Sequence, residues 1–180
     1  EPWLGGKKPQ SLSLSIYSSN QFQLNPRTFD VDRNRSLGII GASVGLAKRL
    51  QWPSDYFTLS QTISYQAFNL NDYQFRVGED ILSNGNLNNL SYNVTLSRNS
   101  AGPSLIFPTY GSNFSLSAKA TIPYSLFSDR DYSNLPPAER FKWLEYYKLI
   151  FRGRWFNGFT PKLVLMANTE IGYLGFYNRE

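Results

Sequence analysis

The residues that most simply suggest chemistry are three glycines followed by a lysine, at Gly38, Gly41, Gly45 and Lys48. Such a set invites a phosphate-binding interpretation, because the N–H groups of a glycine-rich loop can hold phosphate oxygens while a lysine neutralises them. The spacing fits neither the phosphate-binding loop nor the dinucleotide-binding fingerprint. Glycine at a strand bend or beside a bulky neighbour is the favoured interpretation.

Two groups of acidic residues could suggest calcium, namely Asp30 with Asp32, and Asp72 with Glu79 and Asp80. Neither group has the spacing of a known calcium loop, so solvated loop charges are favoured and no metal site is expected.

Histidine and cysteine are both absent from the sequence. Histidine-based triads, thiolate chemistry, disulfides and the commonest zinc ligands are therefore excluded. No pair of carboxylates placed for acid–base work is recognisable. We expect no catalytic residue and no cofactor, so the protein is not expected to be an enzyme.

The pattern that organises the chain is period-two alternation of apolar and polar residues, which predicts β-strands with one apolar face. It is clearest in Leu90–Ser97 and Phe114–Ile122, which are separated by a connection containing Gly102, Pro103, Pro108 and Gly111. Five further strands are expected at Ser11–Ile16, Leu37–Arg49, Tyr56–Ala67, Leu144–Phe156 and Leu163–Leu174. The segment Pro136–Arg140 predicts one or two helical turns that continue through Trp143.

An alternating sheet can be half of a soluble sandwich or the wall of a membrane barrel. The connections Ser18–Arg35, Asn69–Asn89 and Ser125–Lys142 are long and polar, whereas those after the second and sixth strands are short. This alternation is typical of outer-membrane barrels, and no run approaches the ~20 apolar residues of a spanning helix. A soluble ligand-binding barrel should have an apolar interior, which Ser13, Thr95, Ser117 and Lys119 argue against.

The alternation assigns side chains to the two faces of a transmembrane antiparallel β-barrel. Lipid-facing residues are expected to be Leu12, Leu14, Ile16, Val44, Leu46, Leu96, Leu116 and Leu149. Charged residues facing the lumen are expected to be Lys119, Lys148, Arg152, Arg154 and Glu170. Aromatic residues near strand ends, which would form girdles at the membrane interfaces, are Trp3, Trp52, Trp143, Trp155 and Tyr173.

One cross-strand ion pair is expected on the polar face. A short turn centred near Phe159 would place Lys148 opposite Glu170, with Arg152 as the partner if the register slips.

The net charge of +5 could indicate nucleic-acid binding. The lysines and arginines are scattered over loops and strand faces, so a solvated mixed-charge surface is favoured and no nucleic-acid partner is expected.

Several short motifs resemble the outer-membrane protein assembly factor family, BamA, in a form typical of Bacteroidota. The opening Glu1–Leu4 is similar to the family's turn before a barrel strand. The segment Ile106–Asn113, which leads into Phe114–Pro123, resembles the family's "FPTDGS" turn, with Tyr110 in place of its usual charged residue. Leu163–Gly175 is similar to the strand that precedes the family's lumen-inserted loop.

This resemblance implies that residues 1–180 are about strands five to eleven of a sixteen-stranded barrel in the bacterial outer membrane. The chain begins at Glu1 without a methionine, and we expect it to be a piece of a longer protein. The POTRA domains, the seam strands of the lateral gate and the loop with the Arg-Gly-Phe signature would lie outside it.

The implied function is to fold and insert client β-barrel proteins at the seam, aided by local thinning of the bilayer, with no covalent step. The implied partners are outer-membrane lipids and lipopolysaccharide, client barrels, other parts of the same barrel and accessory assembly lipoproteins. Two alternatives stay open: a related translocation or secretion pore, and an outer-membrane enzyme barrel acting on lipid or peptide.

Overall fold

The computed structural model describes residues 10–25, 27–77, 80–104, 106–127, 136, 139, 141–160 and 162–177. These residues form an all-β protein. The elements are β1 (Gln10–Leu24), β2 (Val31–Arg49), β3 (Phe57–Asn71), β4 (Phe75–Val77), β5 (Asp80–Leu82), β6 (Gly85–Asn99), β7 (Gly102–Pro103), β8 (Pro108–Thr121), the 3-10 turn η2 (Tyr124–Phe127), β9 (Tyr146–Thr160) and β10 (Leu163–Phe176). No helix in the described part of the chain is long and apolar enough to cross a membrane.

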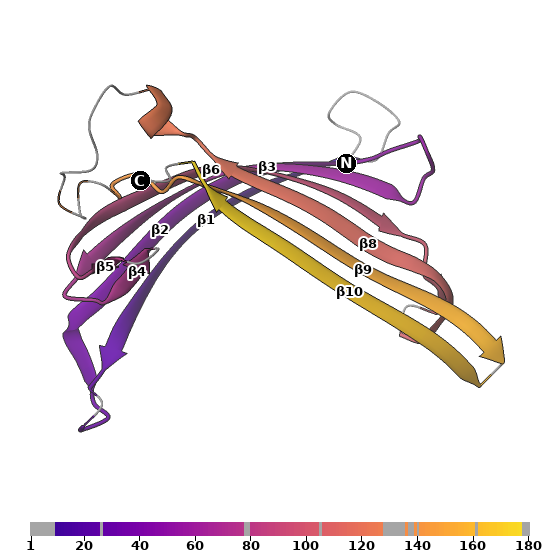
Figure 1. Ribbon diagram of the computed structural model, residues 1–180, viewed down its shortest axis with the longest axis horizontal. Coiled ribbons are helices and arrows are strands. Elements are labelled where there is room, and N and C mark those ends of the chain that lie inside the picture. Colours follow the sequence, from indigo (N-terminus) through magenta and orange to yellow (C-terminus); the bar gives the residue numbers. More distant parts are fainter. Residues whose placement is uncertain are drawn as a thin grey trace.

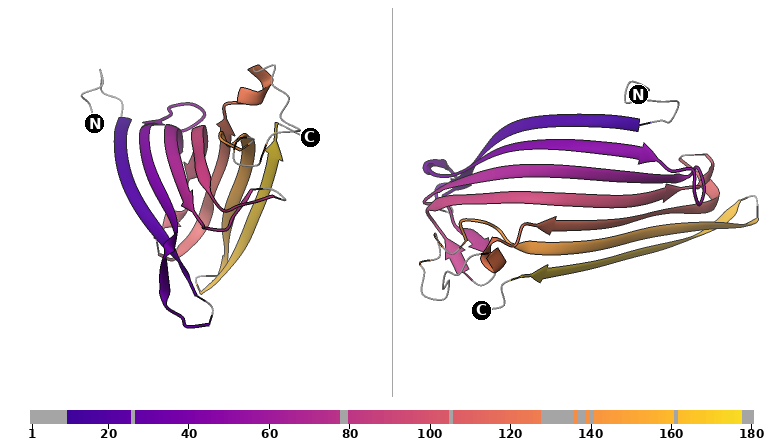
Figure 2. Two further views of the ribbon diagram at one scale, coloured as in Figure 1. Left: turned by 90° about the vertical axis from the view of Figure 1, so that its left-hand side faces the viewer. Right: turned by 90° about the horizontal axis from the view of Figure 1, so that it is seen from above.

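Seven long strands form one antiparallel meander in the spatial order β1-β2-β3-β6-β8-β9-β10. The short strand β7 pairs with β8, and β4 pairs with β5 in a separate hairpin. Within the described residues the sheet is not closed, because β1 and β10 are its two edges. The sheet is a single arched layer (Figure 1), and the view from above places β1 and β10 on opposite margins (Figure 2).

All seven strands expected from the alternation are present, and most extend beyond the expected bounds. The expected loop Ser18–Arg35 is wrong, because β1 continues to Leu24 and β2 begins at Val31. Ladder hydrogen bonds join backbone groups, so a polar stretch can stay paired without an apolar face. A bulge between Phe22 and Gln23 absorbs the unequal lengths of the two strands.

The second expected loop, Asn69–Asn89, is also shorter than expected, since β3 continues to Asn71 and β6 begins at Gly85. The intervening residues form the β4–β5 hairpin. The third, Ser125–Lys142, falls largely outside the described residues, as does most of the helix expected from Pro136. Trp143 is not helical: it forms an isolated parallel bridge with Asn88 of β6, beside the hydrogen bond from Leu144 N to Asn88 O at 2.9 Å.

The buried apolar cluster of the described residues is small and lies at the end of the sheet with the longer connections. Leu37 and Leu70 are opposite each other on β2 and β3, and Leu87 of β6 is opposite Phe68. Leu82 of the β4–β5 hairpin completes the cluster, and Phe75 and Phe141 pack against it. The hairpin therefore folds back onto one face of the sheet rather than extending freely.

Candidate functional site

One face of the sheet carries apolar side chains on every long strand, and we call it the apolar face. The register aligns these side chains in rows that cross the sheet, such as Leu14, Val44, Ile63 and Tyr92 on β1, β2, β3 and β6. All eight residues expected to face lipid lie on this one face. The apolar face comprises Leu12, Leu14, Ile16, Ile40, Val44, Leu46, Leu59, Ile63, Tyr92, Leu96, Leu116, Leu149, Phe151, Ile171 and Tyr173.

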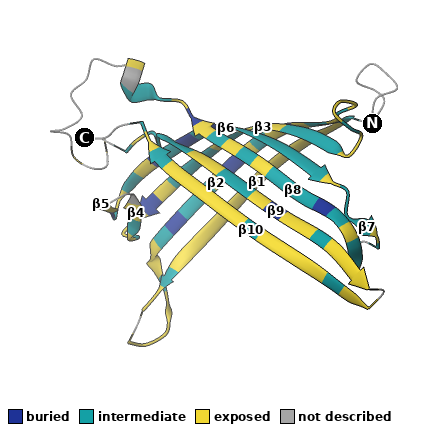
Figure 3. Cartoon of the chain, turned by 45° about the vertical axis from the view of Figure 1, so that its right-hand side comes forward, coloured by how far each residue is buried: buried dark blue, intermediate teal, exposed yellow. Residues whose placement is uncertain are grey.

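The apolar face is open to its surroundings. Leu14 is 71% exposed, Ile16 is 76% exposed and Ile171 is 62% exposed. Figure 3 shows that most residues of the edge strand β10 are exposed. In the described part of the chain, extensive contacts between elements join only neighbouring strands, so no second layer covers this face.

Two tyrosine hydroxyls on the apolar face donate hydrogen bonds to neighbouring amide side chains. Gln61 interrupts the apolar row of β3, and the hydroxyl of Tyr92 on β6 donates to its Oε1 at 2.7 Å. Tyr65 donates in the same way to Asn88 Oδ1 at 2.7 Å. A satisfied acceptor costs much less to remove from water than a free one, so these residues remain compatible with an apolar surrounding.

Aromatic side chains gather toward the two ends of the long strands. Trp52 in the β2–β3 connection is 84% exposed, and Trp155 of β9 packs on Phe151 with ring centroids 6.5 Å apart. At the opposite end, Trp143 packs on Tyr124 at 4.5 Å, and Tyr173 packs on Tyr147 at 5.9 Å. Trp3 lies outside the described residues.

Arg98 of β6 was not predicted from the sequence as a site residue. It lies beside two further aromatic rings. Its guanidinium carbon is 6.0 Å from the ring centroid of Tyr56 and 5.9 Å from that of Phe57. It also donates a hydrogen bond to Ser112 Oγ. Stacking on rings and bonding to a hydroxyl let a cation lie at the margin of an apolar surface.

The opposite face, which we call the polar face, carries hydroxyl, amide and charged side chains. One row crosses five strands with Ser15, Ser43, Ser64, Ser91 and Thr121. Within this row Ser43 Oγ donates to Ser15 Oγ at 3.3 Å, and the hydroxyls of Ser64 and Ser91 are 2.8 Å apart. The two faces therefore differ in chemistry, although the polar face also carries apolar side chains under the β4–β5 hairpin and on β9 and β10, such as Ile150 and Leu174.

Tyr17 packs across the neighbouring strand. It lies in the middle of β1 on the polar face, not near a strand end, and its ring covers Gly41 of β2. This contact agrees with the interpretation of Gly41 as a glycine beside a bulky neighbour. The Tyr17 hydroxyl accepts a hydrogen bond from Gln66 of β3.

The five charged residues expected on the polar face share it. Arg152 of β9 lies directly opposite Glu170 of β10, and Arg152 Nε is 2.8 Å from Glu170 Oε1. The expected first partner, Lys148, is wrong, because it lies opposite Leu174. β9 continues to Thr160 and β10 begins at Leu163, so the turn is centred further along the chain than Phe159. Arg154 lies opposite Asn168, and Lys119 lies opposite Lys148.

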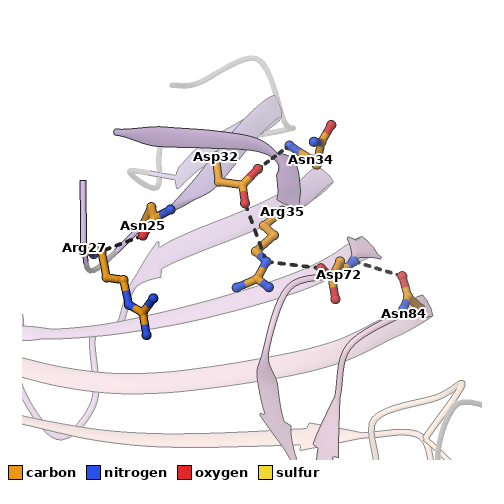
Figure 4. A network of polar contacts seen from close by, with 7 residues as sticks. All are labelled: Asn25, Arg27, Asp32, Asn34, Arg35, Asp72 and Asn84. Carbon is orange, nitrogen blue, oxygen red and sulfur yellow. Dashed lines mark hydrogen bonds and ion pairs between the residues drawn. The ribbon is translucent and has the colours of Figure 1, made fainter. Parts of the chain in front are cut away.

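Arg35 connects two of the acids that suggested calcium. Its Nε is 3.6 Å from Asp32 Oδ2 and 3.1 Å from Asp72 Oδ2, while Asp72 N donates to Asn84 Oδ1 at 2.9 Å (Figure 4). The Arg35 guanidinium therefore supplies the positive charge beside these two carboxylates that a bound calcium ion would otherwise supply. No group of three or more acidic residues in the described part of the chain could hold a metal ion.

No protein-family model matches this sequence, and no curated protein matches it.

Proposed function

We propose that this chain forms part of the wall of a transmembrane β-barrel in the bacterial outer membrane. The observation that carries this proposal is the uncovered apolar face, which crosses seven strands and lies opposite a polar face. Monomeric soluble proteins rarely expose apolar patches beyond a few hundred Å². In a barrel wall the same surface meets lipid while the polar face lines a hydrated lumen.

Strand length and aromatic placement support the same proposal. The long strands have 14 to 19 residues, whereas a tilted bilayer crossing needs about 9–11. Each strand can therefore cross the hydrocarbon region and project beyond it. Trp52 and Trp155 at one end, with Trp143 and Tyr173 at the other, suit the two aromatic girdles of such a barrel.

The open edges of the sheet agree with a partial barrel. Unpaired backbone groups on an edge strand cost several kcal/mol each in hydrocarbon, so spanning sheets close on themselves. β1 and β10 would need further strands as neighbours. We propose that strands outside this segment close a barrel of about sixteen strands.

We further propose that the barrel is an outer-membrane protein assembly factor that folds and inserts client barrels. The support is the resemblance of three motifs that follow one another along the chain in the family's order, among them the turn Phe107–Ser112. Within it, Gly111 has φ 92°, and a Cβ there would lie 2.2 Å from Ser100 O, so the position requires glycine. Client strands would pair at the seam of the barrel, and no covalent step is involved.

An insertion assay tests this function. Vesicles containing the full-length protein that carries this sequence would receive a urea-unfolded client barrel, and folding would be followed by its electrophoretic shift. Empty vesicles and vesicles with an unrelated barrel of similar size are the controls. Faster client folding with this protein alone supports an assembly factor; folding no faster than in both controls contradicts it.

A further inference from the structure

Two lysines on the polar face lie directly opposite each other, Lys119 on β8 and Lys148 on β9. They border a shallow hollow of about 360 Å³, which is also lined by the polar residues Thr62, Ser64, Asn93 and Ser117 and by one apolar residue, Ile150. The hollow therefore combines two ammonium groups with hydroxyl and amide groups that can donate hydrogen bonds.

The charge of this lysine pair is not compensated within the hollow. No acidic side chain is among its described lining residues, and the ion pairs of the described part of the chain use Arg35 and Arg152. Like charges directly opposite on neighbouring strands destabilise a sheet. An anion placed between the two ammonium groups would remove this repulsion.

One of the two lysines is held in place before any ligand arrives. Lys119 Nζ lies 5.5 Å from the ring centroid of Tyr146. The backbone of Tyr146 is held by Thr121, whose Oγ1 accepts from Tyr146 N at 2.7 Å, and the Tyr146 hydroxyl accepts from Asn89 Nδ2 at 3.5 Å. Attraction between the ammonium and the ring face keeps the charge beside the hollow.

We propose that this hollow binds the phosphate group of a soluble solute. Lysine ammonium groups act as point charges with rotatable donors, which suit a tetrahedral dianion approached from several sides. The phosphate would lie between Lys119 and Lys148 and accept further hydrogen bonds from the hydroxyls of Ser64 and Ser117. The inference depends only on the polar face, so it holds whether or not the barrel is an assembly factor.

Inorganic phosphate is the probe for the test. The full-length protein in detergent micelles would be titrated at constant ionic strength set with chloride, and binding would be followed by phosphorus NMR line width. Lys119→Gln and Lys148→Gln should each weaken binding about tenfold, as expected for the loss of one charge-assisted hydrogen bond. Lys162→Gln, in the β9–β10 connection, should leave binding unchanged.

Removing either lysine also removes the repulsion between them, so both variants are expected to fold. If one does not fold, Tyr146→Leu is the second variant, and it should weaken phosphate binding while leaving both charges in place. Binding that does not saturate, or that is equally strong for acetate, would overturn the proposal. So would undiminished binding by the Lys119→Gln/Lys148→Gln double variant.

Discussion

The ring of Tyr17 on β1 occupies the space above Gly41 on β2, where an added Cβ would lie 2.4 Å from Tyr17 Cζ. Tyr17 crosses β2 in this way and accepts a hydrogen bond from Gln66 on β3. Gln66 Oε1 accepts in turn from Asn89 Nδ2 of β6 at 3.1 Å. The edge strand β1 is therefore attached to the third and fourth strands of the sheet by side chains, in addition to its ladder with β2.

Gly41→Ala should destabilise the protein by ~1–3 kcal/mol, because the added methyl group displaces the Tyr17 ring. Gly172→Ala is the matched control, since nothing lies within 4 Å of a Cβ added there. Urea unfolding in micelles, followed by tryptophan fluorescence, measures the difference. In a Tyr17→Ser background the Gly41→Ala change should lose most of its cost. Equal effects at the two glycines would contradict the role of the ring.

The ion pair between Arg152 and Glu170 should contribute less than ~1 kcal/mol, because both side chains are more than half exposed. A double-mutant cycle with Arg152→Met and Glu170→Gln should give a small coupling energy, measured by urea unfolding. The same cycle with Lys148→Met in place of Arg152→Met should give none, since Lys148 is opposite Leu174. Coupling of Glu170 to Lys148 instead would show that the register differs from the one described.

The connections after β1, β3 and β8 should face the cell exterior. Epitope tags inserted after Thr28 and after Asn84 should be reachable by antibody on intact cells. Both positions lie at the end of the sheet that has the long connections after β3 and β8, and outer-membrane barrels carry their longer loops on the cell exterior. A tag after Lys162, in the β9–β10 connection, should be reachable only after permeabilisation. A tag after Thr28 or Asn84 that is detected only in permeabilised cells would refute this topology.

Local alternation predicted the strands well, because a period of two is decided by neighbouring residues alone. It did not predict how far they extend. Ser18–Leu24 is polar with little alternation, yet its backbone stays paired with β2 on both sides of the bulge at Phe22 and Gln23. Whether a polar segment forms part of a strand depends on the strand with which it pairs. The sequence of the segment alone does not identify that partner.

Register and cross-strand contacts were harder to predict for the same reason. The partner of Glu170 depends on the backbone between Thr160 and Leu163, and a small shift of the turn exchanges Lys148 for Arg152. Alternation with Ile16 was sufficient to put Tyr17 on the polar face. Its position over Gly41 became clear only once the pairing of β1 with β2 was known.

The central claim is that the apolar face meets lipid, and two adjacent residues of β8 test it most directly. Leu116 lies between Leu96 and Phe151 on the apolar face, whereas Ser117 lies beside Thr95 on the polar face. Single cysteines at these positions would carry a fluorophore in vesicles containing the full-length protein. We predict that nitroxide-labelled lipids quench the probe at position 116 and that a water-soluble quencher acts mainly at position 117. Lipid quenching stronger at position 117, or equal at both, would contradict the barrel-wall account.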